Sequence, residues 1–295
     1  MFKLLEYNML NTPSASGEVM DYGIKMIGAP LEWTESKGKG IKVGIIDTGV
    51  DYNHPDLKDR IKGYENFSDE NTDMDLNGHG THVAGIIGAS LNGIGVVGVA
   101  PECEIYSAKA FKKDGSADNT AISKALEWLI EKDVNVINMS FASEKPSDEI
   151  YKKIQRAYNK GIILVAAAGN DGSTVNSIGY PAKWKEVIAV TAVDIENKHA
   201  EFSSCGKEAL VAAPGKEIYS TFPDNSYKAL SGTSMSTPLI AGAVALFQCK
   251  ARNRFKRFLS PSEMKLMICM YADDFGETGR DDCYGYGIFS FGRIK

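Results

Sequence analysis

The chain has 295 residues, of which 43% are hydrophobic and 24% charged, and its formal net charge is −5. This composition is typical of a soluble globular protein, and the acidic excess argues against nucleic acid or an anionic membrane as a partner. No apolar run reaches the roughly 18 residues that a membrane span needs.

The first 20 residues have no clear hydrophobic period and are predicted to form a mobile tail anchored by Leu4 and Leu5, ahead of a single domain over residues 21–295. Polar residues interrupt the apolar part of this tail, so it is too short for the core of a secretory signal. The five cysteines are odd in number and lack CxxC spacing, which favours free thiols in a reducing compartment over disulfides or zinc. These features predict a cytoplasmic protein.

From residue 41 onward, apolar β-branched runs alternate with helical patterns. Strands are predicted at 41–46, 104–110, 134–139, 162–168, 187–193 and 209–213, and helices at 79–88, 119–131 and 148–160. This alternation predicts an α/β fold, with a doubly wound, mainly parallel sheet and helices on both faces.

Polar residues stand where these elements begin or end. Asp47 follows the first strand, His79 opens a helix, and Ser140 and Asn170 follow later strands. Ser234 lies in a Gly-Thr-Ser turn before a buried, Ala-rich helix. In an open parallel sheet such positions converge at the carboxyl edge, although Asp47 alone also fits a simple turn residue. A serine, a base, a carboxylate and an oxyanion donor are what acyl transfer requires.

The pair His79 and His82 also raises a zinc interpretation. Metalloprotease helices space two histidines four residues apart with a glutamate beside the first, and that pattern is missing here. The zinc interpretation is therefore disfavoured, and one histidine is predicted to be a base and the other structural.

Three segments resemble the signatures of the subtilisin-like serine proteases: Asp47-Thr48-Gly49, His79-Gly80-Thr81-His82 and Gly232-Thr233-Ser234-Met235-Ser236. His79 follows Asp47 by 32 residues and Ser234 follows His79 by 155, which also fits that family. The resemblance implies a serine endopeptidase of subtilisin-like fold that forms an acyl-enzyme. It implies Ser234 as nucleophile, His79 as general base, Asp47 as its orienter and Asn170 as oxyanion donor, and it makes His82 structural.

The resemblance also implies a substrate cleft with broad specificity for proteins and peptides. The matching residues of the substrate-pairing edge and pocket are Ser140, Phe141, Ala142, Ala168, Gly169 and Gly179, with Ile122 in the outer pocket. Glycine at the floor, Gly179, implies room for a large apolar residue before the scissile bond. Ala142 departs from the family, which usually has glycine there.

Subtilisin relatives bind calcium, and the matching residues here are Asp56, Asn92, Ile94 and Val96. Carboxylate and carbonyl oxygens from a tight loop suit Ca²⁺. A second cation site, around Ala182, Trp184 and Glu208, is a weaker match, because the carboxylate expected near Leu210 is missing.

Residues 23–30 and the short tail resemble the intracellular subtilisins, which implies an inhibitory propeptide over residues 1–20 and intracellular protein substrates. Leu4-Leu5-Glu6-Tyr7 matches the anchor of that tail, with Glu6 where the anchor has proline. A homodimer is possible in this subgroup, although the longer C-terminal arm used for it is missing.

Two other function classes have sequence features that can be compared with this chain. A catalytically silent binding protein on the same fold would have lost triad residues, whereas Asp47, His79, Asn170 and Ser234 are all present. An α/β-hydrolase esterase would need Gly-x-Ser-x-Gly, and Ser236 replaces the second glycine.

Overall fold

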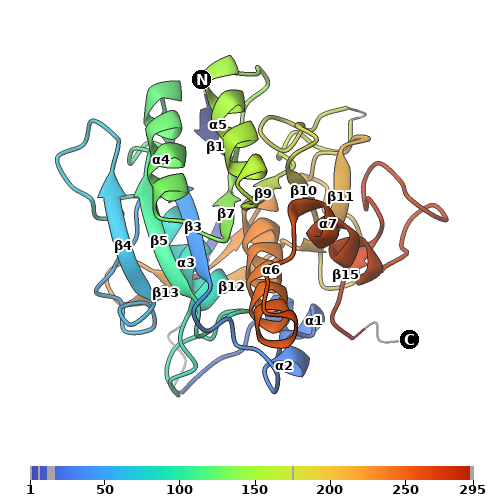
Figure 1. The fold of residues 1–295 in the computed structure, drawn as a ribbon, viewed down its shortest axis with the longest axis horizontal. Helices are drawn as coiled ribbons and strands as arrows, with labels where there is room; N and C mark the ends of the chain where they lie inside the picture. The colour runs from blue at the N-terminus through green and yellow to red at the C-terminus, as the bar shows by residue number, and fades with distance from the viewer. Residues whose placement is uncertain (1, 6, 12–16, 175, 293–295) are drawn as a thin grey trace.

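The computed structural model describes residues 2–5, 7–11, 17–174 and 176–292. Its main sheet has nine strands in the order β14-β15-β11-β10-β9-β7-β3-β5-β4, parallel except at the β14–β15 edge (Figure 1). In chain order the strands are β3 (Lys42–Asp47), β4 (Ile61–Asn66), β5 (Glu104–Lys109), β7 (Val136–Met139), β9 (Ile163–Ala167), β10 (Ile188–Val193), β11 (Ala209–Pro214), β14 (Ala272–Asp273) and β15 (Ile288–Phe289).

Helices cover both faces of the sheet, which confirms the predicted α/β class. One face packs against α3 (His79–Gly88), α6 (Thr233–Phe255) and α7 (Pro261–Met270), and the other against α4 (Asn119–Glu131) and α5 (Asp148–Asn159). Two short helices, α1 (Tyr22–Met26) and α2 (Ala29–Glu32), precede the sheet. Strand β3 shows how the sequence builds both layers: Val43 and Ile45 are buried on the α3 and α6 side, and Ile46 is buried on the α4 side.

Helix α6 begins earlier than its apolar run suggested. It starts at Thr233, so Pro238 lies inside the helix rather than in its first turn. A proline has no N–H to donate to the carbonyl four residues earlier, which here belongs to Ser234. The hydroxyl of Ser140 donates to that carbonyl at 3.0 Å and so replaces the missing helix bond.

The N-terminal tail is docked, and the prediction of a mobile tail is wrong for its described residues. Strand β1 (Phe2–Leu4) pairs antiparallel with both β6 (Ser116–Ala117) and β8 (Phe141–Ala142). Strand β2 (Asn8–Asn11) joins the hairpin of β12 (Ile218–Phe222) and β13 (Ser226–Ser231). The sequence of the tail does not show this docking, because the tail forms its backbone hydrogen bonds with strands that are distant along the chain. Glu6 and the segment 12–16 lie outside the described residues.

Two cysteines also differ from expectation. Cys205 and Cys283 form a disulfide across 78 residues of sequence, while Cys103, Cys249 and Cys269 are free. The prediction of free thiols is therefore wrong for this pair, because spacing along the chain did not reveal that the two loops meet. Among the described residues, none of the helices has the length and apolar character needed to cross a membrane.

Candidate active site

A buried carboxylate–imidazole pair lies at the carboxyl edge of the sheet. Asp47 is the last residue of β3 and His79 the first of α3, and both side chains are fully buried. The distance between His79 Nδ1 and Asp47 Oδ1 is 2.8 Å, and the Thr48 backbone N–H also donates to Asp47 Oδ1 at 2.8 Å. An Nδ1–H donated to the carboxylate leaves the Nε2 lone pair of a neutral imidazole as the basic site. Among the described residues, none forms a hydrogen bond with Nε2.

Close packing of α3 on the end of β3 produces this contact. A Cβ on Gly80 would lie 2.1 Å from the Gly49 carbonyl oxygen, so only glycine allows the helix to approach so closely. Asp75 fixes the start of the helix: its carboxylate accepts from the Thr48 hydroxyl at 2.8 Å and from the Thr81 N–H and hydroxyl. Asp75 was not predicted from the sequence, although an aspartate three residues before Gly78 is a usual turn signal.

Ser234 is the second residue of α6 and is fully buried. Its hydroxyl donates to the Ser140 carbonyl at 3.0 Å, in exchange for the bond from the Ser140 hydroxyl to the Ser234 carbonyl. The Ser234 hydroxyl is thus hydrogen-bonded to the predicted substrate edge, and among the described residues His79 Nε2 has no hydrogen-bond partner. Its position in the first turn of a 23-residue helix places it at the positive end of the helix dipole.

Asn170 lies beside this turn. Its Oδ1 accepts from the Thr233 N–H at 3.0 Å and from the Thr233 hydroxyl at 2.9 Å, which fixes the plane of the amide. The Nδ2 atom lies 3.1 Å from the position that a Cβ on Gly232 would take. The amide nitrogen therefore faces the same turn that carries Ser234.

His82 is buried one turn after His79, and its Nε2 lies 3.0 Å from the carbonyls of both Ile218 and Lys228. It therefore ties α3 to β12 and β13. Burial lowers the pKa of His82 from 6.5 to about 3. A proton on Nδ1 would also lack an acceptor among the described residues.

This burial predicts an acid-sensitive fold. Because the pKa is lower in the folded state, the unfolded chain binds a proton first as the pH falls below about 6.5, and stability decreases by about 1.4 kcal/mol per pH unit down to about pH 3. In His82→Gln, the slope of the unfolding free energy against pH between 6 and 4 should be smaller by about that amount. Denaturant titrations in a Ser234→Ala background measure it, and parallel slopes would exclude His82 as the titrating group.

The predicted substrate edge is occupied by the chain itself. In register, Phe2 faces Ala117 on β6, and Leu4 faces Phe141 on β8. The Phe2 side chain is 1% exposed and packs edge-on against Phe141 at 5.8 Å between ring centroids, in the buried cluster that also holds Ile122. The buried anchor of the tail is thus Phe2, which the sequence analysis missed, while Leu4 and Leu5 are half-buried.

Next along the cleft is a pocket bordered by residues of the tail, of the substrate edge and of the Asn170 loop. Its lining residues include Leu5, Ala142, Asn170, Ile178 and Gly179. A Cβ on Gly179 would lie 3.0 Å from the Ala142 Cβ. The methyl group of Ala142 therefore narrows the pocket on the side where the missing side chain of Gly179 leaves space. Ala168 and Gly169 are buried in the adjoining wall, where the Gly179 N–H donates to the Ala168 carbonyl at 2.9 Å.

Tyr7 places the tail over the predicted catalytic residues. Its ring centroid is 5.3 Å from that of His79, and its hydroxyl donates to Asn77 Oδ1 at 3.0 Å. Its Cβ is 3.8 Å from the position that a Cβ on Gly232 would take. Burial, together with the charges of Asp75 and Asp47, raises the pKa of Tyr7 to about 12. The tail therefore separates His79 from solvent.

The predicted calcium residues meet in one loop. Asp56 Oδ2 accepts from the Val96 N–H at 2.9 Å and the Tyr227 hydroxyl at 3.0 Å, and its Oδ1 accepts from Asn92 Nδ2 at 3.2 Å. The oxygen-rich donor set fits a hard cation. In the present arrangement, however, protein donors already satisfy the carboxylate, so an ion would have to displace them. Ile94 is exposed at the tip of the loop.

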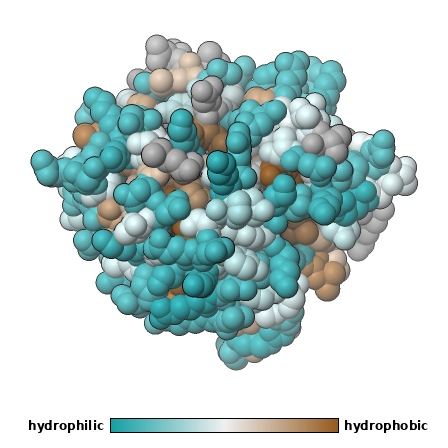
Figure 2. Space-filling model, turned by 90° about the horizontal axis from the view of Figure 1, so that it is seen from above, coloured by the Kyte–Doolittle hydropathy of each residue, from teal (hydrophilic) through white to brown (hydrophobic). Residues whose placement is uncertain are grey.

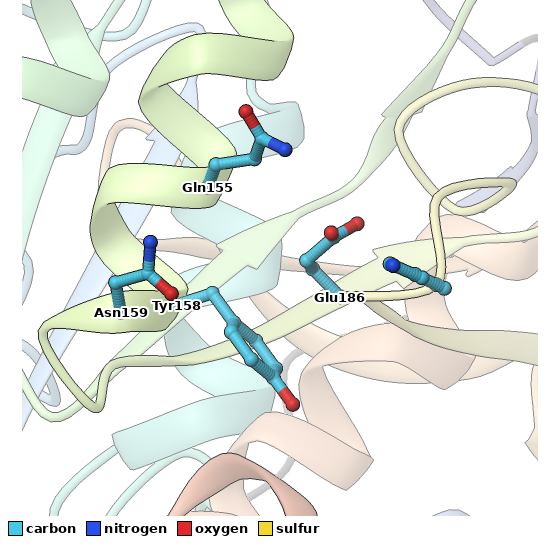
Figure 3. Close-up of a pocket in the computed structure, with 5 residues that line it drawn as sticks. Gln155, Tyr158, Asn159 and Glu186 are labelled. Atoms are coloured by element: carbon cyan, nitrogen blue, oxygen red, sulfur yellow. The ribbon is translucent and has the colours of Figure 1, made fainter.

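The face above the strand ends is mostly hydrophilic, and apolar side chains show there only in small, separate areas (Figure 2). A different pocket lies between the end of α5 and the segment before β10, and so near the amino ends of the strands (Figure 3). Its lining residues are Gln155, Tyr158, Asn159, Lys185 and Glu186. It contains none of the predicted catalytic residues.

Comparison with known proteins supports a single family. Residues 38–287 match the model of the subtilase family. The chain is 42% identical over 276 residues to subtilisin DY of Bacillus licheniformis, covering 92% of this chain and 97% of the relative. It is 39% identical over 269 residues to an intracellular serine protease of Paenibacillus polymyxa (88% and 82%), and 40% identical over 252 residues to the major intracellular serine protease of Bacillus subtilis (82% and 79%).

Proposed function

Because the chain belongs to the subtilase family of serine endopeptidases, we propose that Asp47, His79 and Ser234 form its catalytic triad. The observation that carries this proposal is the buried 2.8 Å contact between His79 Nδ1 and Asp47 Oδ1 at the edge of the sheet where α6 presents Ser234. Asp47 holds the imidazole in one tautomer and stabilises the imidazolium that forms during reaction.

The mechanism begins with a rotation of the serine hydroxyl. The Ser234 Oγ–H leaves the Ser140 carbonyl and donates to His79 Nε2, which accepts the proton as Oγ attacks the substrate carbonyl. The new oxyanion lies against the Asn170 side-chain amide at the N-terminal end of α6, where the helix dipole also favours negative charge. His79 then protonates the leaving amine, and water hydrolyses the acyl-enzyme by the same steps.

Asn170 provides a test of the oxyanion step. We expect Asn170→Ala to lower kcat by about 10²–10³-fold, because one donor to the developing charge is lost, while KM changes little. Steady-state kinetics on a peptide substrate with a tail-free chain measure both constants. A variant with unchanged kcat would remove Asn170 from the oxyanion site.

The proposed substrates are proteins and peptides with a large apolar residue before the scissile bond. Leu5 borders the pocket that would hold this residue. Phe2 lies beside Ile122 and Phe141, the residues of the proposed outer pocket. The tail thus binds the cleft as an apolar substrate would. The cytoplasmic location is proposed only from the relatives that are named intracellular, since the cysteines no longer favour one compartment. A homodimer stays a prediction from the resemblance.

Calcium binding is proposed at the Asp56 loop. A bound ion would take the Asp56 carboxylate, the Asn92 amide oxygen and the carbonyls of Ile94 and Val96, in place of the Val96 and Tyr227 donors. The second site, near Ala182, Trp184 and Glu208, is proposed as weaker; there Glu208 Oε2 is buried without a hydrogen bond to a described residue.

Calcium should therefore raise the thermal stability. At a free Ca²⁺ concentration 100 times Kd, a native-state ligand adds about 2.7 kcal/mol, and an excess of EDTA should remove that increment. Differential scanning calorimetry of the Ser234→Ala chain measures it, with Asn92→Ala as the variant that should lose the response. Identical melting curves in calcium and EDTA would contradict the proposed site and mean that hydrogen bonds to Asp56 stabilise the loop without an ion.

We also propose that the tail is an inhibitory propeptide. Its strand β1 takes the place of a substrate between β6 and β8, and Tyr7 covers His79. Together these contacts would exclude a substrate until the tail is removed or displaced.

A further inference from the structure

Away from the triad, three side chains of types that bind metals lie close together, next to the loop that carries Asn170. The ligand atoms of His199, Cys205 and Cys283 all lie within 4.8 Å of one another. His199 Nε2 is 3.4 Å from Cys205 Sγ, and Cys205 is bonded to Cys283. This is the only such group among the described residues.

Hydrogen bonds between backbone groups of the three residues and neighbouring hydroxyls hold the group in place, among them the Cys205 N–H that donates to the Ser177 hydroxyl at 3.1 Å. The His199 N–H donates to the Tyr284 hydroxyl at 2.8 Å, and the Thr191 hydroxyl donates to the Cys283 carbonyl at 2.6 Å. The Cys205 side chain is 1% exposed. The arrangement is thus fixed by the surrounding fold and does not depend on the disulfide alone.

We propose that reduction of this disulfide creates a binding site for one zinc ion, formed by the thiolates of Cys205 and Cys283 and by His199 Nε2. A dithiol reductant supplies two electrons and two protons: the S–S bond breaks, two thiols form, and the reductant becomes a disulfide. Zinc binding then releases the two thiol protons to solvent. Water takes the fourth position of the tetrahedron.

The observed geometry matches the ion. Zinc bonds of about 2.3 Å to sulfur and about 2.0 Å to nitrogen, at tetrahedral angles, separate the sulfur and nitrogen by about 3.5 Å. The Cys205 and His199 atoms are already 3.4 Å apart. Once the S–S bond is broken, rotation of the Cys283 side chain can increase the distance between the two sulfur atoms to that of two ligands on one zinc ion. Two thiolates and an imidazole select zinc over the hard Ca²⁺ proposed for the Asp56 loop.

The site adjoins the active-site loop without belonging to it. The Ser204 N–H donates to the Gly169 carbonyl at 3.0 Å, and the Asp171 N–H donates to the Ser204 hydroxyl at 3.2 Å. Cys205 is the next residue along the chain, so the cluster adjoins the loop that carries Asn170. In a reducing compartment the pair would be thiols and the zinc site would be open.

Cobalt binding to the full chain tests the proposal, with Ser234→Ala included to prevent self-digestion. After reduction by a trialkylphosphine and anaerobic desalting, we expect one Co²⁺ per chain, a thiolate-to-cobalt charge-transfer band and the intense visible bands of a tetrahedral site. One equivalent of Zn²⁺ should abolish them. The oxidised chain should show none of these bands.

Variants locate the site. Cys283→Ser and His199→Gln should each weaken cobalt binding by about 100-fold or more, because loss of even an outer-shell partner costs 10–100-fold. Cys269→Ser, which changes a free and half-buried cysteine on α7, should leave the spectrum unchanged. Circular dichroism confirms that each variant is folded. The proposal is overturned if the reduced chain shows no thiolate band, if the oxidised chain shows the same one, or if folded Cys283→Ser retains it.

Discussion

The Ser234→Ala chain, freed of its tail, should lose peptide hydrolysis almost completely while keeping its fold. The fall in kcat should be about 10⁶-fold, a magnitude taken over from subtilisin, where loss of the nucleophile or of the base removes the covalent step. The residual rate comes from binding and from the oxyanion donors, which the substitution leaves in place. Hydrolysis of a peptide with Phe or Leu before the scissile bond measures it.

A neighbouring serine offers the matched control. Ser236 is also buried in the first turns of α6, yet its hydroxyl has no hydrogen bond to a described residue, so Ser236→Ala should retain most of the activity. Circular dichroism and the melting temperature establish that both variants are folded. Robust turnover by purified, folded Ser234→Ala would exclude Ser234 as the nucleophile.

The second large effect concerns the tail. A chain lacking residues 2–16 should hydrolyse the same peptide at least about 100-fold faster than the intact chain. A tethered segment acts at an effective concentration near the millimolar range, so an intrinsic affinity of about 10 µM already gives that inhibition. Glu18 stays in this truncation because its carboxylate binds the Asn92 and Gly93 amides and supports the Asp56 loop.

Single substitutions in the tail test whether inhibition depends on its specific contacts and not only on the presence of the extra residues. Phe2→Ala removes the buried anchor and Tyr7→Ala removes the contact with His79, so each should activate the intact chain, whereas Lys3→Ala changes an exposed side chain and should not. A synthetic peptide of residues 1–11 should inhibit the truncated chain competitively. Initial rates are taken with the intact mass recorded, so that self-cleavage is not mistaken for relief. Equal rates for truncated and intact chains would show that the tail does not inhibit.

Much of the fold was predictable because central strands such as β7 and β9 are buried on both faces and read as apolar runs. The half-exposed edge strand β4 has no such run and was not predicted. The helices α4 and α5 were predicted within one residue, since Asp118 and Ser147 give them clear N-cap residues. The docked tail was not predictable, because Phe2 gains its burial from Phe141, which lies 139 residues further along the chain. Such partners leave no local pattern in the sequence.

In the candidate site, too, some features were predictable from the sequence and others were not. Asp47, His79 and Ser234 stand at element ends, where the sequence signals them directly. The contacts that position them depend on tertiary structure. Asp75 accepts a hydrogen bond from the Thr48 hydroxyl, and the Ser140 hydroxyl donates to the Ser234 carbonyl, which has no helix donor because residue 238 is proline. The disulfide was not predicted because the contact between two distant loops, unlike a helical period, leaves no pattern in the spacing of residues.

The most direct test of the central claim is active-site labelling with a fluorophosphonate, followed by intact mass and peptide mapping. With the chain lacking residues 2–16, we predict one adduct per chain, on Ser234, and none in Ser234→Ala or in a folded His79→Ala variant. The intact chain should label much more slowly, because Tyr7 covers His79. A folded, tail-free chain that forms no adduct, or one on another serine, would contradict the proposed triad.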